Sequence, residues 1–337
     1  MQTVTFAPSP DQYAFTFGGV DPVLKINPGT AMQLWCQDAY CGRISSLHDK
    51  ASECLVPTEL NPQTGPFYVN GAEAGDTLAI HIVDLTPAHT QGASALIPYF
   101  GGLTSTPQNP TLQPALDERT YIYEYDAQTD TVRYAAQGSD LVLDLPANPM
   151  LGTVGVAPAA REVRTSLVPD AFGGNMDTPQ MRAGTTCFLS VNVDGALFSL
   201  GDGHYRQGEG ESCGTAVEGA MHVTVIVDLI KGGGGAWPRL ETDDALCVIG
   251  SGRPLEDAWR ISQVDMVGWL GDLYGLDPID AYQLVAQIGQ VPIANVVDTN
   301  FSAVTKIDKS LLPEVSAYGG MHQRMREAAR TLGTITY

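Results

Sequence analysis

The sequence has few basic residues and no long apolar run. It holds 18 Lys and Arg against 38 Asp and Glu, which gives a net charge of −20 at pH 7. Such a chain repels phosphate groups and anionic lipids, so we expect neither nucleic acid nor a membrane as a partner. No stretch reaches the roughly 18 uninterrupted apolar residues that a membrane-spanning helix needs. The acidic surplus is typical of a solvated surface, or of a local carboxylate cluster that holds a cation.

The cysteines lack the CxxC spacing of a zinc ribbon. The N-terminal MQTVTFAPSPDQYAF has neither the basic region nor the apolar core of an export signal, so we expect a cytoplasmic protein. Thiols stay unpaired in that reducing compartment, and we expect most of them to be buried. The six cysteines are Cys36, Cys41, Cys54, Cys187, Cys213 and Cys247.

Glycine and proline punctuate the chain, with 36 and 22 residues among 337. Short apolar or alternating runs between them predict strands at 78–85, 120–125, 131–135, 186–193 and 222–230. We therefore expect a mainly β fold with a smaller α part (α+β), built from two packed sandwich-like or barrel-like β lobes plus C-terminal helices. The chain reads as a single unit over 1–337, with an N-terminal β lobe at 1–165, a central β lobe carrying the site at 166–250, and a helical segment with a closing strand at 251–337.

Helical patterns begin after residue 252. One helix is predicted to end at Gly275, and a second to begin with Asp277 as its N-cap and Pro278 in its first turn. A last helix is predicted over 321–330. The buried face of the first helix is expected to hold Leu255, Trp259, Val264, Val267 and Leu270.

The most informative stretch is 195–218, GALFSLGDGHYRQGEGESCGTAVE. Four carboxylates lie near one imidazole here, and such a group raises the pKa of its members or recruits a metal such as Zn²⁺, Mn²⁺ or Fe²⁺. We expect a strand at 196–200 to deliver Asp202 and His204 at its end. A glycine-rich loop with solvated acids remains an alternative. The charged residues are Asp202, His204, Glu209, Glu211 and Glu218.

A second candidate is 171–177, AFGGNMD. Its Gly-Gly-Asn turn offers backbone N–H groups and the side-chain amide of Asn175, the donors that an oxyanion needs, but it also fits a plain β-turn. A third candidate is 61–76, NPQTGPFYVNGAEAGD, which turns and strand starts explain adequately, with a functional role as the alternative. His81 and His222 lie in predicted strands and are expected to be packed or solvated there.

Cys213 suggests a different mechanism, covalent catalysis by a thiol. A thiol next to Glu211 and Glu218 is a candidate nucleophile beside a base. Neighbouring anions raise the pKa of a thiol, however, and favour a buried structural cysteine.

These stretches together resemble the acetamidase/formamidase family. NPQTGPFYVNGAEAGDTLAIHIVDL resembles the signature TGP-x-x-V-x-GAE-x-GD, NPMLGTVGVAP the turn MG-x-x-GVAP, and GGNMD with GDGHYRQGEGESCGTAVE the central signature. With DAYQLVAQIGQVPIANVVD, the likeness runs from about residue 25 to about residue 315. It implies hydrolysis of short aliphatic amides, a two-lobed mainly β fold with a small α part, a bound divalent metal and homo-oligomers, from homodimers upward.

We therefore predict a metal-dependent amidohydrolase that cleaves a small carboxamide, formamide-like or acetamide-like, to ammonia and a carboxylate. The expected cofactor is a divalent metal, Zn²⁺ first and Mn²⁺, Fe²⁺ or Ca²⁺ as alternatives. Two alternatives stay open: a thiol amidase that uses Cys213, and a non-catalytic β module with a structural Ca²⁺. The predicted metal ligands are Asp202, His204, Asp38 and Glu218, the base is Glu211 among the candidates Glu209, Glu211 and Glu218, and the oxyanion donors are Gly174 and Asn175.

Overall fold

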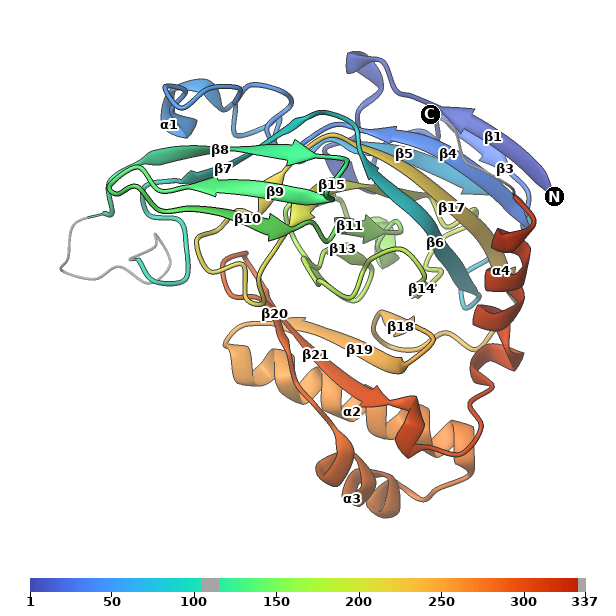
Figure 1. Ribbon diagram of the computed structural model, residues 1–337. Coiled ribbons are helices and arrows are strands. Elements are labelled where there is room, and N and C mark those ends of the chain that lie inside the picture. Colours follow the sequence, from blue (N-terminus) through green and yellow to red (C-terminus); the bar gives the residue numbers. More distant parts are fainter. Residues whose placement is uncertain (105–114, 333–337) are drawn as a thin grey trace.

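The computed structural model describes residues 1–104 and 115–332. Two large β-sheets share one apolar core, and helices cover the end formed by the C-terminal strands (Figure 1). The expected mainly β fold with a smaller α part is confirmed. None of the described helices combines the length and the apolar content that a membrane span needs.

The first sheet has nine strands and combines segments from both ends of the chain. Its central strands β17 and β6 pair over most of their length, from Met221 opposite Pro87 to Ile230 opposite Thr77. In spatial order the strands are β1 (Gln2–Phe6), β4 (Thr30–Cys36), β17 (Met221–Ile230), β6 (Thr77–Pro87), β14 (Thr186–Ser190), β18 (Arg239–Glu241), β19 (Ala245–Gly252), β21 (Phe301–Asp308) and β20 (Ile293–Asn295).

The second sheet has ten strands and contains the strand that matters most for the site, β15. Its main path is β10 (Val142–Pro146), β9 (Thr131–Ala135), β8 (Arg119–Asp126), β7 (Gln91–Leu96), β16 (Val217–Glu218), β15 (Phe198–Arg206), β11 (Met150–Gly155) and β13 (Gly173–Asn175). β5 (Gln63–Val69) also pairs with β15, and β3 (Leu24–Ile26) pairs with β5. β12 (Arg164–Thr165) pairs with β2 (Thr16–Phe17) in a separate small sheet.

The main core lies between these sheets. Ile80 and Val225 from the first sheet belong to the same buried cluster as Phe67, Phe198 and Leu200 from the second. Each of these side chains is at most 1% exposed. Such burial of alternate strand residues is the largest favourable contribution to folding, and it holds the strands of the site in place from behind.

Four α-helices and four short 3₁₀ turns complete the part of the chain that the structure describes. α2 lies close against β19, since a Cβ atom on Gly250 would approach the backbone oxygen of Ala258 to 2.3 Å. α4 covers a separate cluster on the first sheet that includes Phe188 and Ile226. The elements are α1 (Ala51–Cys54), α2 (Leu255–Tyr274), α3 (Pro278–Ile288), α4 (Met321–Arg330), η1 (Pro10–Gln12), η2 (Ala159–Arg161), η3 (Lys309–Leu311) and η4 (Ala317–Gly319).

The predicted helix boundaries are confirmed, but the predicted buried face of α2 is only partly right: Leu270 is buried and Val267 packs against the same cluster, whereas two other positions are exposed. Trp259 and Val264 are 42% and 72% exposed. The face that packs on the sheet holds Ser262 and Asp265 beside apolar residues, and Asp265 is buried because it pairs with Arg239. A count of apolar positions misses a face whose polar members are satisfied inside the protein.

Both large sheets take strands from more than one of the three segments that the sequence suggested. β4, β17 and β21, from the N-terminal, central and C-terminal segments, all lie in the first sheet. The three-segment division therefore stays a prediction about the chain. All six cysteines are free thiols, as expected, but only Cys36, Cys187 and Cys247 are buried.

Candidate functional site

β15 carries the first two site residues. Asp202 and His204 stand two positions apart on this strand, and side chains at that spacing lie on the same face of a sheet. The sequence placed them after a strand at 196–200, which is wrong, because β15 continues to Arg206. The two glycines of this strand explain the difference. A Cβ atom on Gly203 would lie 2.6 Å from the backbone oxygen of Gly219, and one on Gly201 would lie 2.9 Å from the backbone oxygen of Pro62. Only glycine fits at these two positions, because other backbone segments of the protein pass close to the strand.

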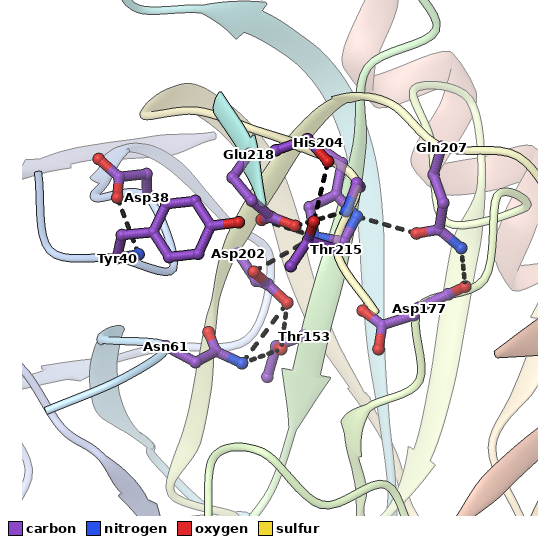
Figure 2. A network of polar contacts seen from close by, with 12 residues as sticks. Asp38, Tyr40, Asn61, Thr153, Asp177, Asp202, His204, Gln207, Thr215 and Glu218 are labelled. Carbon is purple, nitrogen blue, oxygen red and sulfur yellow. Dashed lines mark hydrogen bonds and ion pairs between the residues drawn. The ribbon is translucent and has the colours of Figure 1, made fainter. Parts of the chain in front are cut away.

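His204 lies between two carboxylates. Its Nε2 atom is 3.3 Å from Asp202 Oδ1 and 3.1 Å from Glu218 Oε2, and all three side chains are at most 4% exposed (Figure 2). Burial disfavours a charged imidazole, but the charges of Glu218 and Asp202 outweigh it and hold the pKa of His204 well above its usual value. The position at Nε2 therefore calls for a positive charge, either a proton or a metal cation.

Gln207 fixes the other side of the imidazole. Its Nε2 atom donates to the backbone oxygens of Asp177 and Ala294 at 2.6 and 3.2 Å, so its oxygen is turned toward the histidine. That oxygen lies 2.9 Å from Nδ1 of His204, which therefore donates (Figure 2). This partner leaves Nε2 of the neutral ring as the free ligand atom, the arrangement expected of a metal-binding histidine.

A second group of carboxylates faces the same imidazole. One ligand atom each from Asp177, His204 and Glu211 lie within 4.8 Å of one another, as do atoms from Asp202, His204 and Glu218. Burial, followed by the negative charge of its neighbours, raises the pKa of Asp177 well above the ordinary carboxyl value. Burial likewise raises the pKa of Glu211. Like-charged carboxylates in this number are costly to bury unless a cation or protons offset them.

Asn175 connects the second group to a further acid, Asp298. Its side-chain amide donates to Asp177 Oδ2 and to Asp298 Oδ2, each at 2.9 Å. Burial raises the pKa of Asp298 to about 7. Asn295, on β20, approaches the same two carboxylates at 3.4 and 3.3 Å.

Asp202 is held by residues from two other segments. Thr153, on β11, donates to Asp202 Oδ2 at 3.1 Å, and Asn61 lies 3.5 Å from the same atom (Figure 2). Asn61 comes from the turn-rich stretch 61–76, for which the sequence favoured a structural role over a functional one. Its amide also donates to Thr153 and Asn175, so one side chain connects both acidic groups.

The residues present fit a divalent cation. Among the described residues, Asp177 Oδ1 is a buried oxygen without a hydrogen-bond partner. Both groups meet over Gly152, where a Cβ atom would lie 2.4 Å from Asp202 Oδ2, 2.5 Å from Asp177 Oδ1 and 2.8 Å from His204 Cε1. Several carboxylate oxygens with one imidazole nitrogen form a donor set that suits Zn²⁺, Mn²⁺ or Fe²⁺.

Asp202, His204, Glu218 and Glu211 are thus brought together, whereas three other predicted positions lie apart from them. Asp38 accepts from the backbone amides of Tyr40 and Gly42 at 2.8 and 3.1 Å and lines a smaller neighbouring cavity of about 230 Å³. The Cys213 thiol donates to the oxygen of Thr215 at 3.2 Å. Glu209 is exposed and accepts from Gln180 at 3.0 Å.

The predicted oxyanion donors lie on β13. Gly174 pairs with Val154, and its carbonyl accepts from Met176. Its φ of +86° and a space too small for a Cβ atom explain the glycine. The amide of Asn175 already donates to Asp177 and Asp298.

A cavity of about 580 Å³ opens over the acidic group. Asp177, Asp202, His204, Glu211 and Glu218 line one end of it, and Asp298 borders the same end. Buried titratable groups at the end of a large cavity are the usual arrangement of an active site.

Sequence comparison identifies the family. A sequence model described as the Acetamidase/Formamidase family matches residues 17–166 and 145–242. This chain belongs to the acetamidase/formamidase family. An acetamidase from Mycolicibacterium smegmatis is 26% identical over 270 residues, covering 62% of this chain and 63% of that protein. A formamidase from Methylophilus methylotrophus is 26% identical over 254 residues, with 63% and 62% covered. The matches thus span less than two thirds of these relatives.

Solved structures of the family match over most of their length. An acetamidase structure from Yersinia enterocolitica has a TM-score of 0.87 at 38% identity, with 93% of each chain covered. One from Bacillus halodurans has a TM-score of 0.81 at 28% identity, covering 91% of this chain and 98% of that one. The resemblance inferred from the motifs is confirmed.

Proposed function

We propose that this protein hydrolyses a carboxamide to a carboxylate and ammonia in a metal-dependent reaction. The observation that carries the proposal is the position of His204 Nε2, 3.1 and 3.3 Å from two buried carboxylates at the end of a large cavity. Membership of the acetamidase/formamidase family supports the choice of an amide as substrate. A cytoplasmic location and a homo-oligomer remain predictions from the sequence.

Asp202, His204 and Glu218 would hold the metal, with Zn²⁺ proposed first and Mn²⁺, Fe²⁺ or Ca²⁺ as alternatives. A bound divalent cation polarises an amide carbonyl and lowers the pKa of water. Thr153 and Asn61 orient Asp202, while Gln207 orients His204, so the ligand atoms are fixed by contacts beyond the ligands themselves.

Glu211 is proposed as the general base. Its carboxyl lines the cavity, and burial raises its pKa well above the ordinary carboxyl value, which makes it a better proton acceptor. It would take a proton from the attacking water and pass it to the leaving nitrogen. Asp177, in the same group as Glu211 and His204, is proposed to share this proton or to extend the ligand set.

The roles predicted for Asn175, Gly174 and Asp38 remain proposals. Because the amide of Asn175 donates to Asp177 and Asp298, its contacts favour a positioning role more than direct donation to an oxyanion. The contacts of Asp38 with two backbone amides favour capping of its loop over metal binding.

Ammonia release from a panel of amides tests the proposal. Turnover that stops on dialysis against a strong chelator and returns with Zn²⁺ or Mn²⁺ supports it. Inactivation by a thiol-alkylating reagent, with no effect of the chelator, would favour catalysis by Cys213 instead. A protein that loses thermal stability on metal removal and turns over no amide is a metal-stabilised β module.

A further inference from the structure

The cavity over the acidic group is much larger than formamide or acetamide. Its volume is about 580 Å³. A water molecule takes about 30 Å³ of liquid, so acetamide, with four heavy atoms, needs roughly 100 Å³. An acetamide and one water would therefore leave most of the cavity unfilled, while pockets of this size bind molecules several times larger.

The walls away from the carboxylates are apolar. They come from four parts of the chain: the segments that follow α1, β7, β12 and β20. The side chains are Leu55, Pro57, Leu60, Ile97, Pro98, Phe100, Leu167 and Val297. All except Pro57 and Val297 are half-buried, so most of these walls keep apolar surface that a ligand can cover. Burial of apolar surface from both sides is the main source of affinity in such pockets.

The charges around the cavity disfavour an anionic substrate. The polar end holds five carboxylates, and Arg253 is the basic residue on the wall. Its guanidinium donates twice to the backbone oxygen of Asp298, at 2.8 and 3.2 Å, and lies 4.0 Å from the ring centre of Phe301. Arg253 is thus already engaged and does not form an open carboxylate site.

Resting on the proposed amide hydrolysis, we propose that the preferred substrate is an uncharged amide whose acyl group is apolar and clearly larger than acetyl. The amide would lie at the acidic end and the acyl chain along the apolar walls. Each methylene buried there should raise kcat/KM about fourfold until the cavity is filled.

A graded series of amides tests this. Formamide, acetamide, butanamide, hexanamide and phenylacetamide are compared, together with pentanamide and glutaramate, its analogue in which a carboxylate replaces the terminal methyl group. We expect kcat/KM to rise by about 10²-fold from acetamide to hexanamide, and the anionic analogue to fall well below pentanamide. A constant or falling kcat/KM beyond acetamide would overturn the inference and leave amide hydrolysis intact. Turnover of no amide would overturn both.

A pair of variants locates the effect. Leu167→Asn places a polar group on the apolar wall and should lower the ratio of hexanamide to acetamide turnover. Leu311→Asn changes a leucine that is 57% exposed and does not line the cavity, so it should leave the ratio unchanged. Equal ratios in both variants would contradict the assignment of this wall.

A separate observation concerns Tyr40. Its side chain is 4% exposed, and among the described residues its hydroxyl is buried without a hydrogen-bond partner. Figure 2 shows this hydroxyl directed toward Glu218, and Tyr40 and Glu218 line both cavities. A buried donor without a partner needs an explanation, and in this cavity a bound ligand can supply the acceptor.

We infer that the Tyr40 hydroxyl donates to the carbonyl oxygen of the amide and stabilises the oxyanion that forms on it. This inference also rests on the proposed hydrolysis. Loss of one such donor typically costs about 10²-fold or more in kcat. Tyr40→Phe should therefore lose about 10²-fold in kcat with little change in KM.

Thermal stability separates this role from a structural one. Removing an unpartnered buried hydroxyl should leave Tm unchanged or raise it. Tyr205→Phe is the matched control, because the Tyr205 hydroxyl donates to the oxygen of Ala220 at 3.0 Å, and this variant should lower Tm. A Tyr40→Phe protein with normal kcat would overturn the inference, as would one that loses activity only in step with its stability.

Discussion

Glu218 is the cross-strand partner of His204, and Glu218 Oε2 lies 3.1 Å from His204 Nε2. Paired residues on antiparallel strands place their side chains on the same face, so the pairing of β16 with β15 sets this contact. Asp202, two positions before His204, adds a second carboxylate on that face. The backbone alone thus directs three ligand atoms to one point, before any metal binds.

Loss of His204 should therefore remove the metal. His204→Ala takes away the nitrogen ligand and leaves carboxylates without the charge that balances them. Metal bound per chain, measured by elemental analysis after gel filtration, should fall by at least about tenfold. His222→Ala is the control, because that ring meets Trp35 edge-on and lies outside both ligand groups. Normal metal content in His204→Ala would remove His204 from the ligand set.

Glu211→Gln should separate catalysis from metal binding. The amide keeps the size of the carboxylate but accepts no proton, so kcat should fall at least about 10²-fold with little change in KM. Metal content and Tm should stay close to those of the parent protein. The opposite pattern, an active Glu211→Gln and a metal-bound but inactive Glu218→Gln, would exchange the roles of the two acids.

Gly152 tests whether the two acidic groups act as one site. The methyl group of Gly152→Ala would lie 2.4–2.8 Å from atoms of Asp202, Asp177 and His204. These side chains must move apart, so both metal affinity and kcat should fall. Gly208→Ala is the matched control near the same site, since its methyl group would meet open space. Equal metal binding in the two variants would show that the arrangement over Gly152 is unimportant.

Acid should destabilise the fold through His81, remote from the site. The Thr186 hydroxyl lies 2.9 Å from His81 Nδ1 and 2.8 Å from His322 Nδ1. His322 Nε2 in turn contacts Asp243 at 3.2 Å, and Asp243 also pairs with Arg326. Burial, followed by the positive charge of His322, lowers the pKa of His81 to about 4.

The direction of the pH dependence follows from the unfolded chain, in which a histidine has a pKa near 6.5. Between about pH 6.5 and 4 the unfolded state binds the extra proton, so the free energy of unfolding falls as pH falls, by up to about 3 kcal/mol. His81→Asn keeps a donor near the Nδ1 position but does not titrate. Urea unfolding across this range should give a shallower pH dependence in the variant, and parallel curves for the two proteins would contradict the assignment.

Local signals in the sequence predicted many elements correctly. Asp277 caps α3 as expected, accepting from the amides of Ile279 and Asp280, and Gly275 ends α2 in the left-handed conformation. The strand prediction at 131–135 matches β9 at both ends. Capping, turn formation and alternation depend on neighbours along the chain, so a single sequence reports them directly.

The site was predictable only in part. Asp202, His204, Glu211 and Glu218 stand close together in the sequence and signalled themselves by an unusual density of acids. Asp298 reaches them through the pairing of β20 with β21 and a network that includes Asn175, over a hundred positions away. Asn61 arrives in the same way from a turn before β5. Such contacts arise from the packing of distant strands, which residue spacing does not reveal.

Metal titration of the chelated protein tests the central claim most directly. Amide turnover, followed as ammonia release, is measured against the amount of metal bound per chain as Zn²⁺ or Mn²⁺ is returned. We predict negligible turnover without metal and a rise in proportion to the metal bound, reaching the parent rate when the site is filled. Full turnover by a demonstrably metal-free protein would contradict the account.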